Sequence, residues 1–130
     1  MKLNSKRVQV EKTAEELCDF LSDVKNFKSI MPENTTKFEL LDDKSFVFAL
    51  KGMPEIALEL RDVQRPNKVV LGAKSDKIPF TLTGDIQALS GDSSTIELLF
   101  DGQINAMMAM MVKSPLSKFL ETLAENLSEI

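Results

Sequence analysis

Acidic residues in the central segment are the side chains best suited by type to general acid–base chemistry. Those interleaved with apolar residues are Glu59, Asp85, Glu97 and Asp101. A glycosidase-like reaction needs two carboxyl groups that face each other across a pocket. Successive side chains of a strand point to opposite faces of a sheet, so these acids should lie outward, paired with Arg61 or Lys74. We therefore predict no inward acid pair and no catalytic residue.

Nucleophilic chemistry is limited by the absence of histidine and by a single cysteine, Cys18. Without histidine, neither a Ser–His nor a Cys–His pair can form, and the commonest zinc ligand is missing. Cys18 adjoins the apolar stripe of a predicted helix, and no activating cationic partner is evident in the sequence. We expect a buried, inert thiol, no metal site and no cofactor.

Methionine gathers in one short segment: four of the seven methionines fall in Met107-Met108-Ala109-Met110-Met111. Methionine is flexible and polarisable, and it fills irregular gaps in cores as well as adaptable binding surfaces. Three interpretations stay open. The cluster fills a core gap, forms a pliable lid or lining at a cavity mouth, or forms an exposed patch for dimerisation, since four methionines cannot all face inward on one helix.

The elements that would position these residues begin with a strand over Leu3–Val10. The segment Thr13-Ala14-Glu15-Glu16 is a capping box, which predicts a helix that begins there and ends near Asp23. A second short helical piece covers Asn26–Ile30 and ends before Pro32, because the residue preceding a proline disfavours the α region.

The following seventy residues alternate apolar and polar side chains, and this period of two predicts six half-buried antiparallel strands. Together with the first strand they would make a seven-stranded sheet. The turn signals between them are Asp42-Asp43, Gly52-Met53-Pro54, Arg65-Pro66-Asn67, Asp76-Lys77 and Gly91-Asp92. Neither a repeat nor a linker is evident, so we expect a single domain over residues 1–130.

A long helix is predicted at the C-terminus, with Asn105 as its N-cap. From Val112 onward its apolar residues share one face, whereas Met107, Met110 and Met111 fall outside that face at about 100° per residue. Pro115 removes a backbone hydrogen bond and clashes with the preceding turn. The sequence therefore predicts a kink or break between Met111 and Pro115, with Ser114 as a fresh N-cap if the break is complete.

This order of strand, two short helices, six-stranded meander and long helix resembles the START/Bet v 1-like (SRPBCC, polyketide cyclase-like) superfamily. The most specific match is the segment from Val10 to Pro32, which holds a strand, the helix opening Glu15-Glu16-Leu17 and the turn Asp23-Val24-Lys25-Asn26-Phe27-Lys28-Ser29-Ile30-Met31-Pro32. The Met-rich stretch also resembles small bacterial members. The resemblance implies an α+β helix-grip fold, in which a curved seven-stranded antiparallel sheet wraps around the C-terminal helix and often leaves a cavity. Members bind lipids, sterols or hormones, cyclise polyketides, or assist chaperones and metalloenzyme maturation.

The inner face of the sheet and the Met-rich turn make the candidate ligand site. Its expected lining residues are Leu58, Leu60, Leu71, Phe80, Leu82, Ile86, Leu98, Phe100, Met107, Met108, Met111 and Phe119. An apolar space with few polar groups is typical of small-molecule sites, whereas the same pattern also describes a packed core without a binding role. Lys51 and Arg61 could receive an anionic head group, although the sequence does not single them out.

Composition narrows the classes of partner. The net charge is −4, and lysine and arginine are scattered, which argues against a nucleic-acid footprint and against an anionic membrane surface. No apolar stretch reaches the length of a membrane span, so we expect no membrane insertion. The N-terminal segment lacks the apolar core of a secretory signal, and one cysteine cannot form an internal disulfide. These features favour a cytoplasmic protein.

Three functions remain as hypotheses. The first is non-enzymatic binding of a small hydrophobic or amphipathic molecule between sheet and helix. The second is a protein-interaction or homodimerisation module with a closed core. The third is a cyclase- or dehydratase-like enzyme, which would need at least two inward polar groups that the alternation does not supply.

Overall fold

A computed structural model describes residues 1–74 and 79–130, and the predicted turn at Asp76-Lys77 lies outside the described residues. The elements in chain order are β1 (Lys2–Asn4), β2 (Val8–Val10), α1 (Ala14–Ser22), the 3-10 helix η1 (Val24–Ile30), β3 (Thr35–Asp42), β4 (Ser45–Leu50), β5 (Ile56–Gln64), β6 (Lys68–Ala73), β7 (Phe80–Ala88), β8 (Ser94–Gly102) and α2 (Ala106–Leu127).

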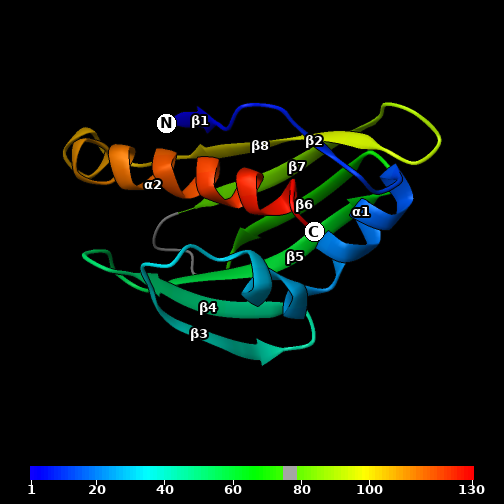
Figure 1. The fold of residues 1–130 in the computed structure, drawn as a ribbon. Helices are drawn as coiled ribbons and strands as arrows, with labels where there is room; N and C mark the ends of the chain where they lie inside the picture. The colour runs from blue at the N-terminus through cyan, green and yellow to red at the C-terminus, as the bar shows by residue number, and fades with distance from the viewer. Residues whose placement is uncertain (75–78) are drawn as a thin grey trace.

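The strands form one antiparallel sheet in the order β1-β8-β7-β6-β5-β4-β3, and β2 also pairs with β8. Figure 1 shows α2 lying along the hollow of this curved sheet, with β7 and β8 on one side and β3 and β4 on the other. The predicted α+β arrangement, a curved antiparallel sheet around a long C-terminal helix, is therefore confirmed. Two short helices precede β3, also as predicted.

The predicted first strand, Leu3–Val10, differs in one respect, because a bulge divides it into β1 and β2. Asn4 pairs with Leu99 and Val8 pairs with Ile96, so three residues of the first strand stand opposite two of β8. The buried Ser5 holds this bulge: its backbone N–H donates to Leu98 O at 2.9 Å, and its Oγ accepts from Leu98 N at 3.0 Å. The extra residue bends the strand and lets both halves follow β8.

The capping box before α1 forms as predicted. The Glu16 N–H donates to Thr13 Oγ1 and the Thr13 N–H donates to Glu16 Oε1, both at 3.1 Å. The apolar stripe of α1 and η1 is buried, and Cys18 lies within it with no exposed surface. These short helices therefore close one end of the sheet.

Of the predicted kink or break between Met111 and Pro115, the break is wrong, since α2 is continuous through the proline and Ser114 caps no helix. Its N-cap is Asn105, as predicted, whose side chain accepts from Met108 N at 2.8 Å. One apolar stripe runs through the whole helix at four-residue spacing: Met108, Val112, Leu116, Leu120 and, a turn further, Leu123 and Leu127. Packing on both sides of Pro115 holds the helix together across the lost hydrogen bond.

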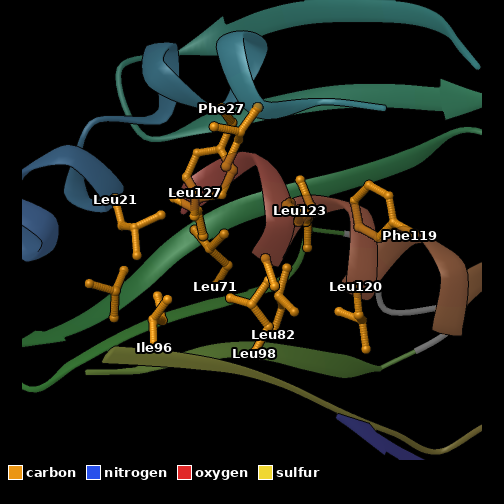
Figure 2. Packing of buried hydrophobic residues seen from close by; sticks show 14 of the residues in the cluster. Leu21, Phe27, Leu71, Leu82, Ile96, Leu98, Phe119, Leu120, Leu123 and Leu127 are labelled. Carbon is orange, nitrogen blue, oxygen red and sulfur yellow. The ribbon is translucent and has the colours of Figure 1, made fainter. Parts of the chain in front are cut away.

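The half of the interior near the C-terminus is a close-packed core. Figure 2 shows Leu123 and Leu127 of α2 beside Leu71, Leu82 and Leu98 of the sheet. A void of about 10 Å³ lies among these residues, which is at most the space of one water. Across residues 1–74 and 79–130, no helix is both long and apolar enough to cross a membrane.

Candidate ligand-binding site

A cavity of about 270 Å³ lies between α2 and the sheet, at the end where β5 and β7 begin and β6 and β8 end. Its deep wall is made of buried side chains: Phe48, Leu58, Ala73, Leu82, Phe100, Leu116, Phe119 and Leu120. Its remaining lining is half-buried or exposed: Met53, Pro54, Glu55, Ile56, Ala57, Phe80, Ile104, Met108 and Val112. The lining thus passes from core to surface, and the mouth lies between the 53–55 loop and the first turns of α2.

Aromatic rings line two sides of this space. Phe80 and Phe100 stack with their ring centroids 5.2 Å apart, and Phe48 stacks on Phe119 of the helix at 5.0 Å. Stacked rings are rigid and bury large apolar areas. The cavity is therefore bounded by fixed walls on the sheet and by a flexible methionine, Met108, on the helix near its mouth.

Gly102, at the end of β8, is required by this aromatic wall. A Cβ atom on Gly102 would lie 2.9 Å from the Phe80 Cβ and 3.1 Å from the ring of Phe100. Real Cβ atoms essentially never come within 3.0 Å of such an atom, and 3.1 Å is tighter than most real contacts, so a side chain at residue 102 would displace the two phenylalanines.

The polar chemistry at the site is sparse. Among the described lining residues, Glu55 at the rim is the one ionisable side chain, and it accepts a hydrogen bond from Lys37 Nζ. That hydrogen bond raises the pKa of Lys37 above its ordinary 10.5. A paired carboxylate at an exposed rim can orient a polar end of a ligand, whereas it supplies no acid–base couple inside the cavity.

The carboxylates considered first for catalysis pair with cations at the surface. Arg7 contacts Asp85 at 3.2 Å and Glu97 at 3.4 Å, and Arg61 contacts Glu59 at 3.3 Å. Asp101 is exposed. In the part of the chain that the structure describes, no group of three or more acidic, histidine or cysteine side chains could hold a metal ion.

Six of the predicted lining residues meet at the cavity: Leu58, Phe80, Leu82, Phe100, Met108 and Phe119. Leu71, Ile86 and Leu98 are instead buried in the close-packed half, and Leu60 is half-buried outside the cavity lining. All four lie on strands whose apolar face runs the length of the sheet, whereas the cavity occupies one end of it. The alternation of apolar and polar residues identifies the apolar face of the sheet, but it does not show which end of that face borders the cavity.

The assignment of Met107 and Met111 to the lining is corrected by the structure. Their side chains are 77% and 74% exposed, and Met110 is 85% exposed. The helix turns about 100° per residue, so only Met108 and Val112 of this stretch follow the inward stripe. The Met-rich turn therefore presents three side chains to solvent and one to the cavity.

Several lining residues were missed at the sequence level. Val112, Leu116 and Leu120 follow Met108 at intervals of four, and this stripe could have revealed them if the helix had been expected to continue. Phe48 alternates with other inward residues of β4. The loop residue Met53 carried only a turn signal, so nothing in the sequence placed it at the mouth.

Comparison with known proteins yields structural matches only, since no family model and no curated protein sequence matches the chain. A START superfamily protein from Mycobacterium smegmatis superposes with a TM-score of 0.75 at 17% identity, over 98% of this chain and 94% of that one. The chain has the helix-grip fold of the START superfamily.

Two further matches show how widely this START-like fold is used. Norcoclaurine synthase from Thalictrum flavum matches with a TM-score of 0.72 at 12% identity, over 99% of this chain and 84% of that one. The di-domain ARO/CYC protein BexL of the BE-7585A biosynthetic pathway matches at 0.67 and 12%, over 98% of this chain and 46% of that one. At such identities the START-like fold is established, and function has to be argued from the site.

Proposed function

We propose that this protein binds a small hydrophobic or amphipathic molecule in the cavity between α2 and the sheet, without catalysing a reaction. The observation that carries the proposal is the continuous apolar lining of a space of about 270 Å³ that reaches the surface. This volume lies just below the range of about 300–1,000 Å³ typical of small-molecule sites. A ligand on the order of ten non-hydrogen atoms would fill it, at about 30 Å³ per water-sized group.

The contrast between the two halves of the interior supports a binding role. The half near the C-terminus packs to a residual void of about 10 Å³ with similar leucine and phenylalanine side chains. A protein interior normally packs to near-crystalline density, and each unfilled volume costs stability. A large apolar void at one end of a well-packed core is therefore better explained by an occupant than by poor packing.

A non-enzymatic role is favoured by the chemistry of the described lining. Norcoclaurine synthase and the ARO/CYC protein share the fold, so an enzymatic role is the natural competitor. Cyclisation and related reactions need positioned acids and bases at the reacting atoms. Among the described lining residues, the only ionisable group is the carboxylate of Glu55 at the rim, and it is already paired with Lys37. The proposal also includes no cofactor and a reducing compartment such as the cytoplasm, in keeping with one buried thiol.

NMR signals of the methionine methyl groups can test this proposal, because some of the seven methionines line the cavity and others face solvent. We expect 1-octanol, added to methyl-labelled protein, to shift the NMR signals of Met53 and Met108, which line the cavity. The signals of Met107 and Met110, which face solvent, should stay in place. Native mass spectrometry of protein from its own host should show a bound small molecule.

Two results would contradict the proposal. Shifts confined to Met107, Met110 and Met111 would mean that octanol binds the surface. Unchanged Met53 and Met108 signals at saturating octanol, together with a ligand-free mass, would mean that the cavity does not bind.

The three exposed methionines favour a second candidate function, the association of two copies of this chain. Met107, Met110 and Met111 are each at least 74% exposed on neighbouring turns of one helix. Exposed apolar clusters of this kind often mark interaction surfaces. Sedimentation at several concentrations tests it: a dimer that disappears in the double variant Met110→Lys, Met111→Lys would support association, and a monomer at all concentrations would exclude it.

A further inference from the structure

A second concavity, of about 740 Å³, runs along the other flank of α2. One side is formed by the helix positions Ser114, Lys118 and Thr122, and the other by the loop after η1 and the end of β4. Unlike the cavity, this groove is bordered by polar side chains. We call it the lysine groove, after Lys51 and Lys118.

The charges in the lysine groove are unbalanced. Lys51 comes from the turn after β4 and Lys118 from α2, and both are exposed. Within residues 1–74 and 79–130, neither has an acidic partner within 4.0 Å, which is also true of Lys2, Lys12, Lys28, Lys44, Lys68 and Lys113. What distinguishes Lys51 and Lys118 is that both line the same groove. Glu33 is the one acidic side chain among the described residues of the groove. The protein as a whole carries a net charge of −4, so two free cations in one groove run against its general charge.

The lysine groove and the cavity are neighbours that share two walls. Met53 and Phe119 line both spaces. Phe119 is buried and held by its stack on Phe48, whereas Met53 is half-buried on a loop. The loop from Lys51 to Glu55 thus passes from the groove to the cavity mouth, with the flexible Met53 side chain between them.

We propose that the ligand is an amphipath with a single anionic head group, whose chain fills the cavity and whose head group is bound in the lysine groove by Lys51 and Lys118. This inference rests on the proposed function and adds the ligand class to it. The head group remains in water at the groove while the chain is removed from water, so neither part loses its preferred surroundings. A lysine ammonium is a flexible point charge, and it suits carboxylate and phosphate head groups alike.

The test compares sodium octanoate with 1-octanol, which share a chain and differ in charge, by calorimetric titration of the whole protein. We expect octanoate to bind at least about fivefold more tightly than octanol at low salt. Lys51→Gln and Lys118→Gln should each weaken octanoate binding about two- to fivefold and leave octanol binding unchanged. The advantage of octanoate should shrink at high salt, because exposed charges are screened.

Lys113→Gln is the matched control. Lys113 is exposed on α2, lines neither the cavity nor the groove, and is free of an acidic partner among the described residues. It should leave the affinity for octanoate unchanged. An equal loss of octanoate affinity in Lys113→Gln would show a general charge effect and overturn the assignment to the groove.

A parallel titration with inorganic phosphate distinguishes binding of a free anion from binding of a head group attached to a chain. If phosphate bound as tightly as octanoate, the proposal that the ligand is an amphipath would be overturned.

The experiment distinguishes a failure of this inference from a failure of the proposed function. Equal binding of octanoate and octanol, unaffected by the lysine variants, would overturn the head-group assignment while the cavity remains a binding site. Absence of binding by both compounds would overturn both. Because all three lysines are exposed, their glutamine variants should fold, and their thermal unfolding confirms this.

Discussion

The ring of Phe119 on α2 stacks on the ring of Phe48 on β4, with centroids 5.0 Å apart and 11° between the ring planes. Phe119 lines both the cavity and the lysine groove, so a single ring attaches the helix to the sheet and borders the two spaces. Phe119→Ala should lower the free energy of unfolding by about 3–5 kcal/mol, as for other large core truncations. Urea denaturation measures this loss.

Phe119→Leu is the milder partner of that variant and should keep the protein folded for binding assays. It removes the stack and part of the wall, so we expect a ligand with a bulkier chain, such as 2-ethylhexanol, to gain affinity relative to 1-octanol. An unchanged preference, measured by calorimetry in a folded variant, would show that Phe119 does not limit the space.

The size of the cavity can be reduced from the sheet side at Ala73, which is buried and lines it. Ala73→Leu adds three carbons to an open volume, so we expect weaker octanol binding and no loss of stability. Ala124→Leu adds the same three carbons at a fully buried position, because Ala124 has no exposed surface and lines neither the cavity nor the 10 Å³ void. That change should cost about 1–3 kcal/mol by overpacking. Equal destabilisation of both variants would contradict the presence of a void at Ala73.

A side chain at Gly102 should be unfavourable, because a Cβ there would approach Phe80 and Phe100 to 2.9 and 3.1 Å. Gly102→Ala should therefore destabilise the protein by about 1–3 kcal/mol and disturb the aromatic wall of the cavity. Gly91→Ala is the control, since nothing lies within 4 Å of a Cβ at that position. Urea midpoints and NMR ring-proton shifts report the two effects; equal midpoints for the two variants would exclude the clash.

Pro115 lies inside a continuous helix, where it cannot donate to the Met111 carbonyl. Pro115→Ala should restore this hydrogen bond and raise the free energy of unfolding by about 2 kcal/mol. This is the cost of about 3 kcal/mol for an interior proline, less about 0.4–1 kcal/mol because proline restrains the unfolded chain. Ser114→Ala at the preceding exposed position should change stability far less. A destabilised Pro115→Ala variant would show that the packing of α2 depends on the shape that the proline imposes.

Asp42 at the turn between β3 and β4 should contribute to acid sensitivity. Its carboxylate accepts from the Lys44 backbone N–H at 2.8 Å and from Lys74 Nζ at 3.0 Å, and these bonds lower its pKa from 3.8 to about 2. A lowered folded-state pKa stabilises the protein at pH values above the unfolded-state pKa. This contribution is therefore complete above about pH 4 and is lost as the pH falls toward 2.

Asp42→Asn should make the unfolding free energy less dependent on pH between about pH 4 and pH 2, where the wild type loses this contribution. Urea titrations at pH 7 and pH 2.5 give the comparison, and Asp43→Asn, one residue along, is the control. A wild type and an Asp42→Asn variant with parallel pH profiles over this interval would contradict the role of Asp42.

Local patterns in the sequence determined much of the fold. The period of two along the strands is visible in short stretches of sequence. The capping box at Thr13 and Glu16 and the N-cap at Asn105 depend on contacts within a few residues. Such contacts are formed by neighbours in the chain, so the sequence alone predicts them. Together with the segment from Val10 to Pro32, they were enough to predict the helix-grip arrangement.

Tertiary packing decided the features on which the candidate site depends. The bulge at Ser5 arises from its bonds to Leu98, and α2 continues through Pro115 because both of its halves pack on the same sheet. Period and spacing show which face of a strand or helix is apolar, but not how far the helix stands from the sheet at each end. That separation is set by the sum of the side-chain volumes across the core, so only the folded structure places Met108 and Phe119 around a cavity and brings Lys51 and Lys118 to one groove.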